Sequence, residues 1–474
     1  MRRGSGEPLL LRCRWLIPCA RCGVLEDVDV LVEDGVVRVV ASRGSGLPSG
    51  AFSGHVVDCG RRRVGVPCLY NAHTHAAMVL LRGYYDDSEL FEWLSRMWFV
   101  EKRLTPEVVY HASRIAVVEM LSSATCGFLD MYFMPWETAR AAWEAGVRAG
   151  LGPVIMGRGV DPWRAVEEAS RFVEAVEARY GPLVRGVYNV HSIYAAPLEA
   201  VRLAAGEAAS RGRPLHIHVS ETRREVYEAK KRYGVFPLEL LDRLGAVHGW
   251  SVLVHGGWLA SWEVELAARR GATLVHCPAS NMKLATAGHF PLYEARRLGA
   301  NVAIGTDGAA SNNTLDMLRE MRLAVLLQRH SYWDTRVAAV DAFEAATVGG
   351  ARALGLEGGG RLEPGAPGDV AVLGLERPGL WPPRRGRLVS HIVYSAAAGD
   401  AWLVAVAGRV VYAPWMREEL ERLLEESLGV VEGFLEEVGE GVDPEPPCSP
   451  PGACLGGSGA GEGVADGGAE GQPG

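Results

Sequence analysis

Lysine and glutamine are scarce in this chain of 474 residues, which contains four lysines and two glutamines. Few thermolabile amides are typical of heat-adapted proteins, but such proteins are usually rich in lysine, so the two observations point in different directions. A GC-rich genome explains the preference for arginine over lysine equally well. The composition therefore does not decide whether the protein is adapted to heat.

Long apolar runs and blocks of basic residues are also missing. No apolar segment approaches the roughly 20 residues that a membrane-spanning helix needs. Arg12 and Arg14 interrupt the apolar stretch near the N-terminus, so we expect neither a membrane anchor nor a signal peptide. The net charge of −8 argues against a nucleic-acid partner, and the hydrophobic content of 48% allows a large core. We therefore expect a cytoplasmic protein.

The nine cysteines are scattered along the chain, and most of them lie within apolar segments. This distribution predicts buried free thiols in a reducing compartment. Cys19 and Cys22 have the spacing of metal ligands, but no second pair of this spacing occurs in the part expected to fold, so we expect no structural zinc site. Cys448 and Cys454 lie in the C-terminal tail, and the sequence leaves open whether they pair.

Apolar strand-like segments alternate with amphipathic helices through the middle of the chain. Eight such alternations are typical of a (β/α)8 barrel of the TIM type, in which chemistry takes place at the C-terminal ends of the strands. We therefore predict a catalytic barrel in residues 67–354. The predicted strands are Leu69–His75, Gly127–Met131, Val154–Arg158, Val187–His191, Leu215–His218, Val252–His255, Thr273–Cys277 and Val302–Thr306. The predicted helices include Pro106–Ser122, Glu137–Ala149, Trp163–Arg179, Leu198–Arg211, Trp262–Arg270 and Leu315–Gln328.

Short strand-like segments separated by turns occur at both ends of the chain. They predict a small β-sandwich domain built jointly from residues 1–66 and 355–413. A segment rich in Glu and Leu predicts a helix in residues 414–438, and the composition of residues 439–474 predicts a disordered tail. The predicted sandwich strands are Leu9–Trp15, Val28–Val32, Val36–Ala41, Val56–Cys59, Val370–Leu373, Leu388–Val393, Trp402–Val406 and Arg409–Tyr412.

Several predicted barrel strands end in side chains that can bind a metal ion. His73 and His75 are two residues apart in one extended segment, so both imidazoles point to the same side of the backbone. His218, His255 and Asp307 end three further strands. Two histidines that only cap a strand would be the simpler interpretation of the first pair alone, but the recurrence at four strand ends favours a metal site.

We predict a single divalent ion, with zinc preferred and iron or manganese also suitable, bound by His73, His75, His218 and Asp307. No lysine occurs in Val154–Arg158, or in the fourth predicted strand, where a carbamate bridge to a second ion would be expected. A bound ion lowers the pKa of its water enough to supply hydroxide near neutral pH. Asp307 is then placed both to bind the ion and to accept the proton that this water releases.

Glu221 and His255 are candidates for moving a proton and for orienting or polarising the attacked carbon. Glu221 lies three residues after His218, where the strand turns into its loop, and a carboxyl group there can carry a proton to the substrate. The alternative is that Glu221 caps a helix beginning near Thr222, and at this point the two interpretations are equal. His216 lies two residues before His218, on the same side and deeper in the barrel, and it fits a buried structural histidine better than a ligand; the same interpretation is preferred for His276.

The motifs around these residues resemble those of the amidohydrolase superfamily and, more narrowly, of the 5′-methylthioadenosine/S-adenosylhomocysteine deaminase family. The resemblance runs from the N-terminal strands to the C-terminal helix and leaves out only the tail. The matching segments are residues 71–83 (NAHTHAAMVLLRG), 216–222 (HIHVSET), 278–284 (PASNMKL) and 305–313 (GTDGAASNN).

The resemblance implies a role for each matching residue. It places the metal ligands on the same four residues as the reasoning above, the proton-carrying carboxylate on Glu221 and the orienting histidine on His255. It also implies substrate contacts, among which Glu101 would accept hydrogen bonds from a ribose diol and Arg158 and Arg164 would bind the carboxylate of an amino-acid tail. The implied substrate contacts are Trp93, Glu101, Arg158, Arg164, His191, Glu221, Asp307 and Ser311.

The implied function is metal-dependent hydrolytic deamination of an adenosine-type thioether nucleoside. A relative that acts on another aminated or halogenated heteroaromatic ring, such as guanine or a triazine, is the second interpretation. A non-catalytic scaffold on the same fold is a third, and the complete set of four ligands together with Glu221 counts against it. The expected partner is thus a small nucleoside, with no nucleic acid or membrane involved, and homo-oligomers occur commonly in this superfamily.

Overall fold

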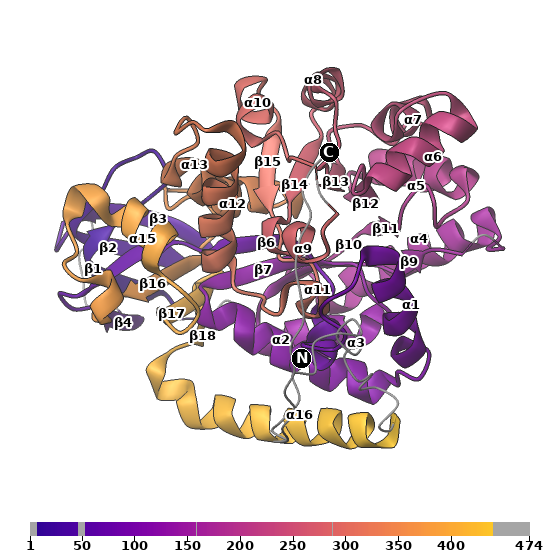
Figure 1. Ribbon diagram of the computed structural model, residues 1–474. Helices are drawn as coiled ribbons and strands as arrows, with labels where there is room; N and C mark the ends of the chain where they lie inside the picture. The colour runs from indigo at the N-terminus through magenta and orange to yellow at the C-terminus, as the bar shows by residue number, and fades with distance from the viewer. Residues whose placement is uncertain (1–6, 46–52, 158, 287, 439–474) are drawn as a thin grey trace, which may run out of the picture.

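The computed structural model describes residues 7–45, 53–157, 159–286 and 288–438. The predictions for Arg158 and for the tail, residues 439–474 with their two cysteines, lie outside these residues. Figure 1 shows the strands at the two ends of the chain gathered on one side of the central strands and helices. Within the described part, no helix combines the length and the apolar character that crossing a membrane requires.

The central strands run parallel to one another and form two sheets in the order β10-β8-β7-β6 and β15-β14-β13-β12-β11-β9. Their burial is nearly complete, as expected for parallel strands that are covered on both faces. The strands of the first sheet are β6 (Leu69–Thr74), β7 (Thr125–Asp130), β8 (Arg148–Leu151) and β10 (Val184–Gly186). Those of the second are β9 (Val154–Ile155), β11 (Tyr188–Val190), β12 (Leu215–Val219), β13 (Ser251–His255), β14 (Thr273–His276) and β15 (Asn301–Ile304).

The two sheets join because the third and fourth barrel positions are each occupied by a broken strand. β8 pairs with β10 and β9 pairs with β11, so the strand order continues from one sheet into the other. The break in the third strand lies at Gly152, where the chain passes so close to its neighbour that a Cβ atom would come within 1.9 Å of the Val187 carbonyl oxygen. Eight barrel positions are therefore occupied in the predicted order.

The strands β6 and β15 are edge strands of the two sheets and lie next to each other. In the described residues they are not paired by a ladder of backbone hydrogen bonds. The Asp307 amide instead donates to the His73 carbonyl oxygen at 3.0 Å. The Asn71 side chain accepts from the Thr306 amide at 3.0 Å and donates to the Thr306 hydroxyl at 2.6 Å. A Cβ atom on Gly305 would lie 2.8 Å from the Cβ of His73, so only glycine fits there. The chain segments that carry predicted metal ligands thus hold these two strands together.

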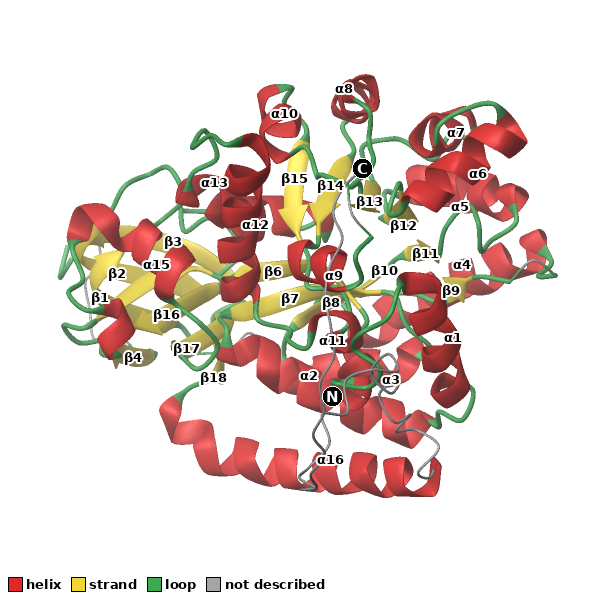
Figure 2. Cartoon of the chain, in the orientation of Figure 1, coloured by secondary structure: helices red, strands yellow, loops and turns green. Residues whose placement is uncertain are grey.

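Helices surround the barrel strands, as the alternating pattern predicts (Figure 2). Capping residues start several of them: the Thr105 hydroxyl accepts from the Val108 amide at 3.3 Å, and the Asp161 carboxylate accepts from the Arg164 amide at 3.0 Å. The helices that precede β13 are α1 (Leu90–Glu101), α2 (Pro106–Ser122), α3 (Pro135–Ala145), α4 (Pro162–Tyr180), α5 (Leu198–Arg211), α6 (Arg223–Tyr233) and α7 (Pro237–Arg243). Those that follow are α8 (Ser261–Arg270), α9 (Pro278–Lys283), α10 (Leu292–Arg297), α11 (Ala309–Asn312), α12 (Met317–Tyr332), α13 (Ala339–Glu344), α14 (Gly350–Ala353), α15 (Leu388–Ser395) and α16 (Arg417–Val438).

Two predicted elements differ from the structure. The helix predicted over Glu137–Ala149 ends at Ala145, because the apolar residues that follow belong to β8 and pair with β7. The strand predicted over Leu388–Val393 is a helix, α15, whose buried residues Leu388, Ile392 and Val393 share one helical face. A short apolar run does not distinguish a buried strand from a buried helix.

The strands at the two chain ends form one eight-stranded sheet, in the order β18-β17-β16-β5-β1-β2-β3 with β4 beside β1. The structure therefore joins both ends of the chain as predicted, but in a single sheet instead of two packed sheets. A separate apolar core, which includes Leu11, Val30, Val372 and Leu403, lies against this sheet. Its strands are β1 (Leu9–Leu16), β2 (Leu25–Glu33), β3 (Val36–Ser42), β4 (His55–Asp58), β5 (Arg63–Pro67), β16 (Val370–Gly374), β17 (Ala401–Val406) and β18 (Arg409–Tyr412).

The cysteines follow the prediction in part. Cys19 and Cys22, which were predicted as free thiols, form a disulfide. The prediction failed there because spacing alone does not show whether two thiols pair. The other cysteines of the described residues are free and buried, as expected for thiols within apolar strands. They are Cys13, Cys59, Cys68, Cys126 and Cys277.

Contacts of α16 and of Asp369 are among those that attach the C-terminal segments to the barrel. The α16 helix lies along α2 (Figure 1), where the Ser427 hydroxyl is 3.2 Å from the His111 ring and Arg114 is 3.1 Å from Glu426. At the start of β16, the buried Asp369 accepts hydrogen bonds from Arg148 of β8 at 2.8 Å and from the Tyr70 hydroxyl of β6 at 2.8 Å.

The charge of Asp369 is stabilised by these partners. Burial alone would raise the pKa of this carboxyl group, but the Arg148 guanidinium and the hydrogen bonds from Ala407 and Tyr70 outweigh burial and hold the pKa below its ordinary value. Asp369 thus connects the terminal sheet to two barrel strands through one buried ion pair.

We predict that Asp369→Asn lowers the free energy of unfolding by about 3–5 kcal/mol, because it leaves the buried Arg148 charge without its partner. A group with a lowered folded-state pKa contributes stability above its unfolded pKa of about 3.9 and loses it as the pH falls through the folded pKa. The difference between wild type and variant should therefore shrink in acid. Denaturant unfolding at several pH values measures it. The control Glu421→Gln, in an exposed pair with Arg417, should change stability by less than about 1 kcal/mol.

Candidate active site

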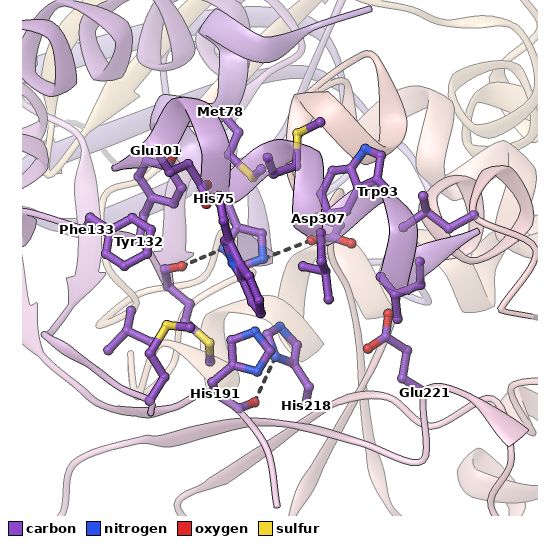
Figure 3. A pocket seen from close by; sticks show the side chains of 18 of the residues that line it. His75, Met78, Trp93, Glu101, Tyr132, Phe133, His191, His218, Glu221 and Asp307 are labelled. Atoms are coloured by element: carbon purple, nitrogen blue, oxygen red, sulfur yellow. Dashed lines mark hydrogen bonds and ion pairs between the residues drawn. The ribbon is translucent and has the colours of Figure 1, made fainter. Parts of the chain in front are cut away.

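The C-terminal ends of the barrel strands enclose a pocket in which imidazoles and carboxylates face one another (Figure 3). The pocket is capped by α1 and is lined largely by apolar side chains. Most of the residues that the sequence predicted for the site are present in it. The polar residues that line it include His75, Glu101, Tyr132, His191, Tyr194, His218, Glu221, His255 and Asp307, and the apolar ones include Met78, Trp93, Met97, Met131, Phe133 and Met156.

Backbone carbonyl groups fix the orientation of two of the predicted ligand rings. The Nδ1 atom of His75 lies 2.5 Å from the Met131 carbonyl oxygen, and the Nδ1 atom of His218 lies 2.8 Å from the His191 carbonyl oxygen. A carbonyl oxygen only accepts, so both Nδ1 atoms carry the hydrogen. Each Nε2 atom therefore points into the cluster, and when the ring is neutral it presents a lone pair there.

The ligand atoms of the four predicted residues lie close together in two overlapping groups: those of His73, His75 and His218 lie within 4.8 Å of one another, and so do those of His73, His255 and Asp307. The His73 Nε2 atom lies 3.2 Å from the His218 Nε2 atom and 3.3 Å from an Asp307 carboxylate oxygen, and the His75 Nε2 atom lies 3.1 Å from the same oxygen. Neighbouring ligands of a tetrahedral ion with bonds of about 2.0–2.1 Å lie about 3.3 Å apart. These three pairs of donors thus have the spacing expected around one small divalent ion, and the His255 ring also lies within reach of His73 and Asp307.

Burial and charge set the protonation of this cluster. Burial lowers the pKa of His73 to about 4 and that of His218 well below its ordinary value. Burial acts in the same direction on His75, but the Asp307 carboxylate outweighs it and raises the pKa of His75 to about 9. A metal ion that binds here at neutral pH must therefore displace a proton from His75.

Asp307 is held in place by hydrogen bonds from two neighbours. The Ser280 hydroxyl donates to one carboxylate oxygen at 2.6 Å, and the Gly308 amide donates to the other at 2.9 Å. Burial would raise the pKa of this carboxyl group, but the imidazoles of His73 and His75 outweigh burial and hold it well below the ordinary value. A carboxylate that stays ionised in this position is a suitable metal ligand.

The backbone at three strand ends adopts a conformation that L-residues rarely occupy. Ser220, His255 and Asp307 have φ angles of 49°, 75° and 62°. Such conformations cost on the order of 1–3 kcal/mol and persist where the surrounding structure enforces them. Here they turn the chain sharply at the ends of β12, β13 and β15, next to the predicted ligands.

The structure decides between the two interpretations of Glu221, because other residues cap α6. The Thr222 hydroxyl accepts from the Glu225 amide at 3.1 Å, and the Glu225 carboxylate accepts from the amides of Ser220 and Glu221 at 3.1 Å and 2.9 Å. The capping interpretation of Glu221 is therefore wrong. Its side chain lines the pocket instead (Figure 3), and burial raises its pKa.

His255 faces Glu221 from the neighbouring strand. Its Nε2 atom lies 3.7 Å from a Glu221 carboxylate oxygen, and its Nδ1 atom lies 2.9 Å from the side-chain oxygen of Asn281 in α9. Both side chains are almost fully buried. A buried carboxyl group beside a fixed imidazole can hold a proton and pass it on, which is the arrangement expected for acid–base chemistry.

The residues predicted to contact substrate divide into two groups. Trp93, Glu101 and His191 line the pocket, and burial raises the pKa of Glu101. Arg164 lies at the exposed start of α4, where its guanidinium is 2.9 Å from Glu168, and it does not line the pocket. The buried Ser311 hydroxyl donates to the Gly308 carbonyl oxygen at 3.1 Å and also lies outside the pocket lining.

Some pocket residues were not predicted from the sequence. Met131 ends a predicted strand and could have been found by that signal, whereas Tyr194 lies in a loop and carries no local signal. His216 was predicted as a structural histidine and contacts His73 directly, with 2.9 Å between their ring nitrogens. Its place two residues before His218, on the same side of the strand, is the signal from which a contact with the site could have been predicted.

Comparison with known proteins agrees with this site. The amidohydrolase family model matches residues 64–411, so the chain belongs to the amidohydrolase family. The 5-methylthioadenosine/S-adenosylhomocysteine deaminase of Pyrococcus furiosus is 40% identical over 410 residues, which cover 85% of this chain and 96% of the relative. The 5′-deoxyadenosine deaminase of Methanothermobacter thermautotrophicus is 38% identical over 397 residues, 83% of this chain and 91% of that protein.

Solved structures show the same fold. An adenosine deaminase from Xanthomonas campestris with bound zinc has a TM-score of 0.82 and 31% identity, and the match covers 90% of this chain and 98% of that one. Its fold and those of the other neighbours agree with a barrel of the TIM type. The family that the sequence motifs predicted is therefore confirmed.

We predict one equivalent of zinc per chain after loading and removal of excess metal. Replacing a ligand should lower this content sharply and abolish activity, because the remaining donors leave the coordination incomplete. Metal analysis of His73→Ala and Asp307→Ala measures this effect, with the exposed His330→Ala as the control that should keep one equivalent. Two equivalents in active wild-type protein would contradict the prediction.

Proposed function

We propose that this protein is a metal-dependent deaminase of adenosine-type thioether nucleosides. It would convert S-adenosylhomocysteine to S-inosylhomocysteine and 5′-methylthioadenosine to 5′-methylthioinosine, with release of ammonia. The observation that carries the proposal is the convergence of the donor atoms of His73, His75, His218 and Asp307 beside the buried Glu221. The deaminase names of relatives at about 40% identity support the nucleoside substrate.

Zinc is the metal we propose, with His73, His75, His218 and Asp307 as its ligands. Three neutral imidazoles and one carboxylate are typical of zinc, although iron and manganese also accept this set. A bound ion of this kind would supply a water molecule of lowered pKa next to the pocket. The zinc in the adenosine deaminase structure supports this choice.

The residues around the proposed ion would handle the protons of the reaction. Water adds to C6 of the purine, and Glu221 gives a proton to the adjacent ring nitrogen, so that the C6–N bond to the amino group can break and ammonia leaves. The raised pKa of Glu221 favours a protonated carboxyl group that is ready to donate. Asp307 would take the proton that the water loses and pass it to the amino group, which leaves as ammonia. The hydroxyl group on C6 would return its proton to Glu221 as it becomes the carbonyl group, and His255 would orient the attacked carbon.

The remaining pocket residues fit a nucleoside with an apolar thioether. Glu101 would accept hydrogen bonds from the ribose hydroxyls, and His191 and Trp93 would line the same part of the pocket. The Trp93 Nε1 atom is buried and has no hydrogen-bond partner within the described residues, so it is free to donate to a ligand. Arg158, Arg164 and Ser311 keep the roles implied by the family motifs as parts of this proposal.

A hydrolase of another aminated or halogenated ring is the second candidate, because neighbours of the same fold act on such rings. An atrazine chlorohydrolase from Arthrobacter aurescens has a TM-score of 0.80, but its 22% identity supports the fold alone. The experiment that separates the candidates is an assay of ammonia release from zinc-loaded protein with adenosine derivatives, guanine and a triazine. Turnover of guanine or the triazine without turnover of any adenosine derivative would reject the nucleoside proposal.

We predict that Glu221→Gln keeps the metal and the fold but lowers kcat by a factor on the order of 10²–10⁴, the effect expected for a lost general acid–base group. Steady-state kinetics with 5′-methylthioadenosine and metal analysis test this together. The control is Glu265→Gln, which removes an exposed carboxylate from α8. Turnover near the wild-type value in Glu221→Gln would show that the carboxyl group takes no part in proton transfer.

The last prediction in this group concerns the amino-acid tail of the substrate. If Arg164 binds the tail carboxylate, Arg164→Ala should lower kcat/KM for S-adenosylhomocysteine by about one to two decades, the value of a charge-assisted hydrogen bond of about 1.5–3 kcal/mol. Turnover of 5′-methylthioadenosine, which lacks the carboxylate, should not change. Arg171→Ala, another exposed arginine of α4, is the control. Equal losses for both substrates would assign Arg164 a structural role.

A further inference from the structure

A chain of buried side chains leads from the barrel wall to one of the proposed metal ligands. It starts at Asn189 of β11, passes through His216 of β12 and ends at His73 of β6. All three side chains are completely buried. The sequence assigned His216 to the core and gave Asn189 no role, and none of the functions proposed above uses either residue.

The orientation of the Asn189 amide is determined by two backbone carbonyl groups. Its side-chain nitrogen donates to the Asp130 carbonyl oxygen at 2.9 Å and to the Gly152 carbonyl oxygen at 2.8 Å. Both amide hydrogens are thereby used, and a reversed amide would place its oxygen against two other oxygens. The side-chain oxygen of Asn189 therefore has to face the opposite way, towards His216.

The fixed amide determines which nitrogen of His216 carries the hydrogen. The Asn189 oxygen lies 3.1 Å from the His216 Nδ1 atom and can only accept, so Nδ1 is the donor. In a neutral ring that carries its hydrogen on Nδ1, the Nε2 atom has a lone pair. That lone pair faces the His73 Nδ1 atom at 2.9 Å, which must then donate.

As a consequence, the Asn189 amide fixes the tautomer of His73, although the His216 ring lies between them. With its hydrogen on Nδ1, His73 presents the lone pair of Nε2 to the point where His75, His218 and Asp307 converge. His75 and His218 obtain the same tautomer from backbone carbonyl oxygens, which no side-chain substitution removes. His73 has no carbonyl partner for its Nδ1 atom and depends on two side chains instead.

We infer that Asn189 and His216 are positioning residues that prepare His73 as a metal ligand. This inference rests on the metal site of the proposed function and extends it by two residues. Hydrogen-bond partners of a ligating histidine are worth about 10–100-fold in metal affinity. Breaking the chain at either residue should weaken the metal site without removing any of its ligands.

The test uses three substitutions that preserve shape. His216→Phe keeps a ring of similar size but cannot accept from His73, and Asn189→Leu removes the amide that fixes His216. His216→Gln keeps one acceptor and one donor and should rescue much of the effect. The matched control is His276→Phe, because His276 also lies buried at a barrel strand end, stacks on Phe290 at 4.5 Å and has no hydrogen-bond partner among the described residues.

Zinc affinity of the full-length protein, measured by competition with a chromophoric chelator, is the primary readout. We expect His216→Phe and Asn189→Leu to bind zinc about 10–100-fold more weakly, and His276→Phe to bind as the wild type does. The visible spectrum of the cobalt-substituted protein is the second readout, because it reports the ligand field directly. It should change in His216→Phe and Asn189→Leu and stay the same in His276→Phe.

The outcomes separate this inference from the proposed function. Wild-type affinity in both His216→Phe and Asn189→Leu overturns the inference and leaves the metal site standing. An equal loss in His276→Phe also overturns it, because any buried ring would then have the same effect. If His216→Phe does not fold, Asn189→Leu against His276→Phe decides. Wild-type protein that binds no divalent metal would reject the proposed function itself.

Discussion

The structure depends on one constraint: the inward ring nitrogens of His73, His75 and His218 have to face one another and the Asp307 carboxylate in a buried space. This arrangement is unfavourable for a protein alone, because buried polar atoms need partners. The chain achieves it by engaging the far nitrogen of each ring. Two of these nitrogens bind backbone carbonyl groups, and the third binds His216. The inward nitrogens then face one another and the Asp307 carboxylate, which is why the cluster is suited to a metal ion.

The same constraint explains where the barrel departs from regularity. Strands β15 and β6 are joined by the backbone around His73 and Asp307 and by the side chain of Asn71, in place of a ladder. The left-handed backbone at His255 and Asp307 belongs to the same region. The strained backbone angles and the missing ladder between β15 and β6 are tolerated because the hydrogen bonds of neighbouring strands and helices hold the chain in this conformation. The predicted binding site and the contact between β15 and β6 are thus built from the same residues.

The acid–base function proposed for the pocket depends on which residues near the start of α6 cap the helix and which one enters the pocket. Thr222 and Glu225 cap α6 and satisfy its first amides, which leaves the Glu221 side chain free to enter the pocket. Burial raises the pKa of Glu221, while the imidazoles around Asp307 lower the pKa of that carboxyl group. The pKa values of two carboxyl groups of the same chemistry are therefore shifted in opposite directions, as suits a reaction that needs both a donor and an acceptor.

The sequence by itself determined the barrel, its strand order and the residues at its strand ends, because apolar periodicity and metal-competent side chains are local features of the chain. The family followed from four short motifs for the same reason. Tertiary structure alone decided the helix at Leu388–Ser395, the single terminal sheet and the Cys19–Cys22 disulfide, since a short apolar run and a cysteine spacing each fit two structures. It also decided that Glu221 is no cap and that Asn189 and His216 lie in a hydrogen-bonded line with His73. Those conclusions depend on which side chains meet across strands far apart in sequence, and a hydrogen bond between distant residues leaves no pattern in the sequence near either one.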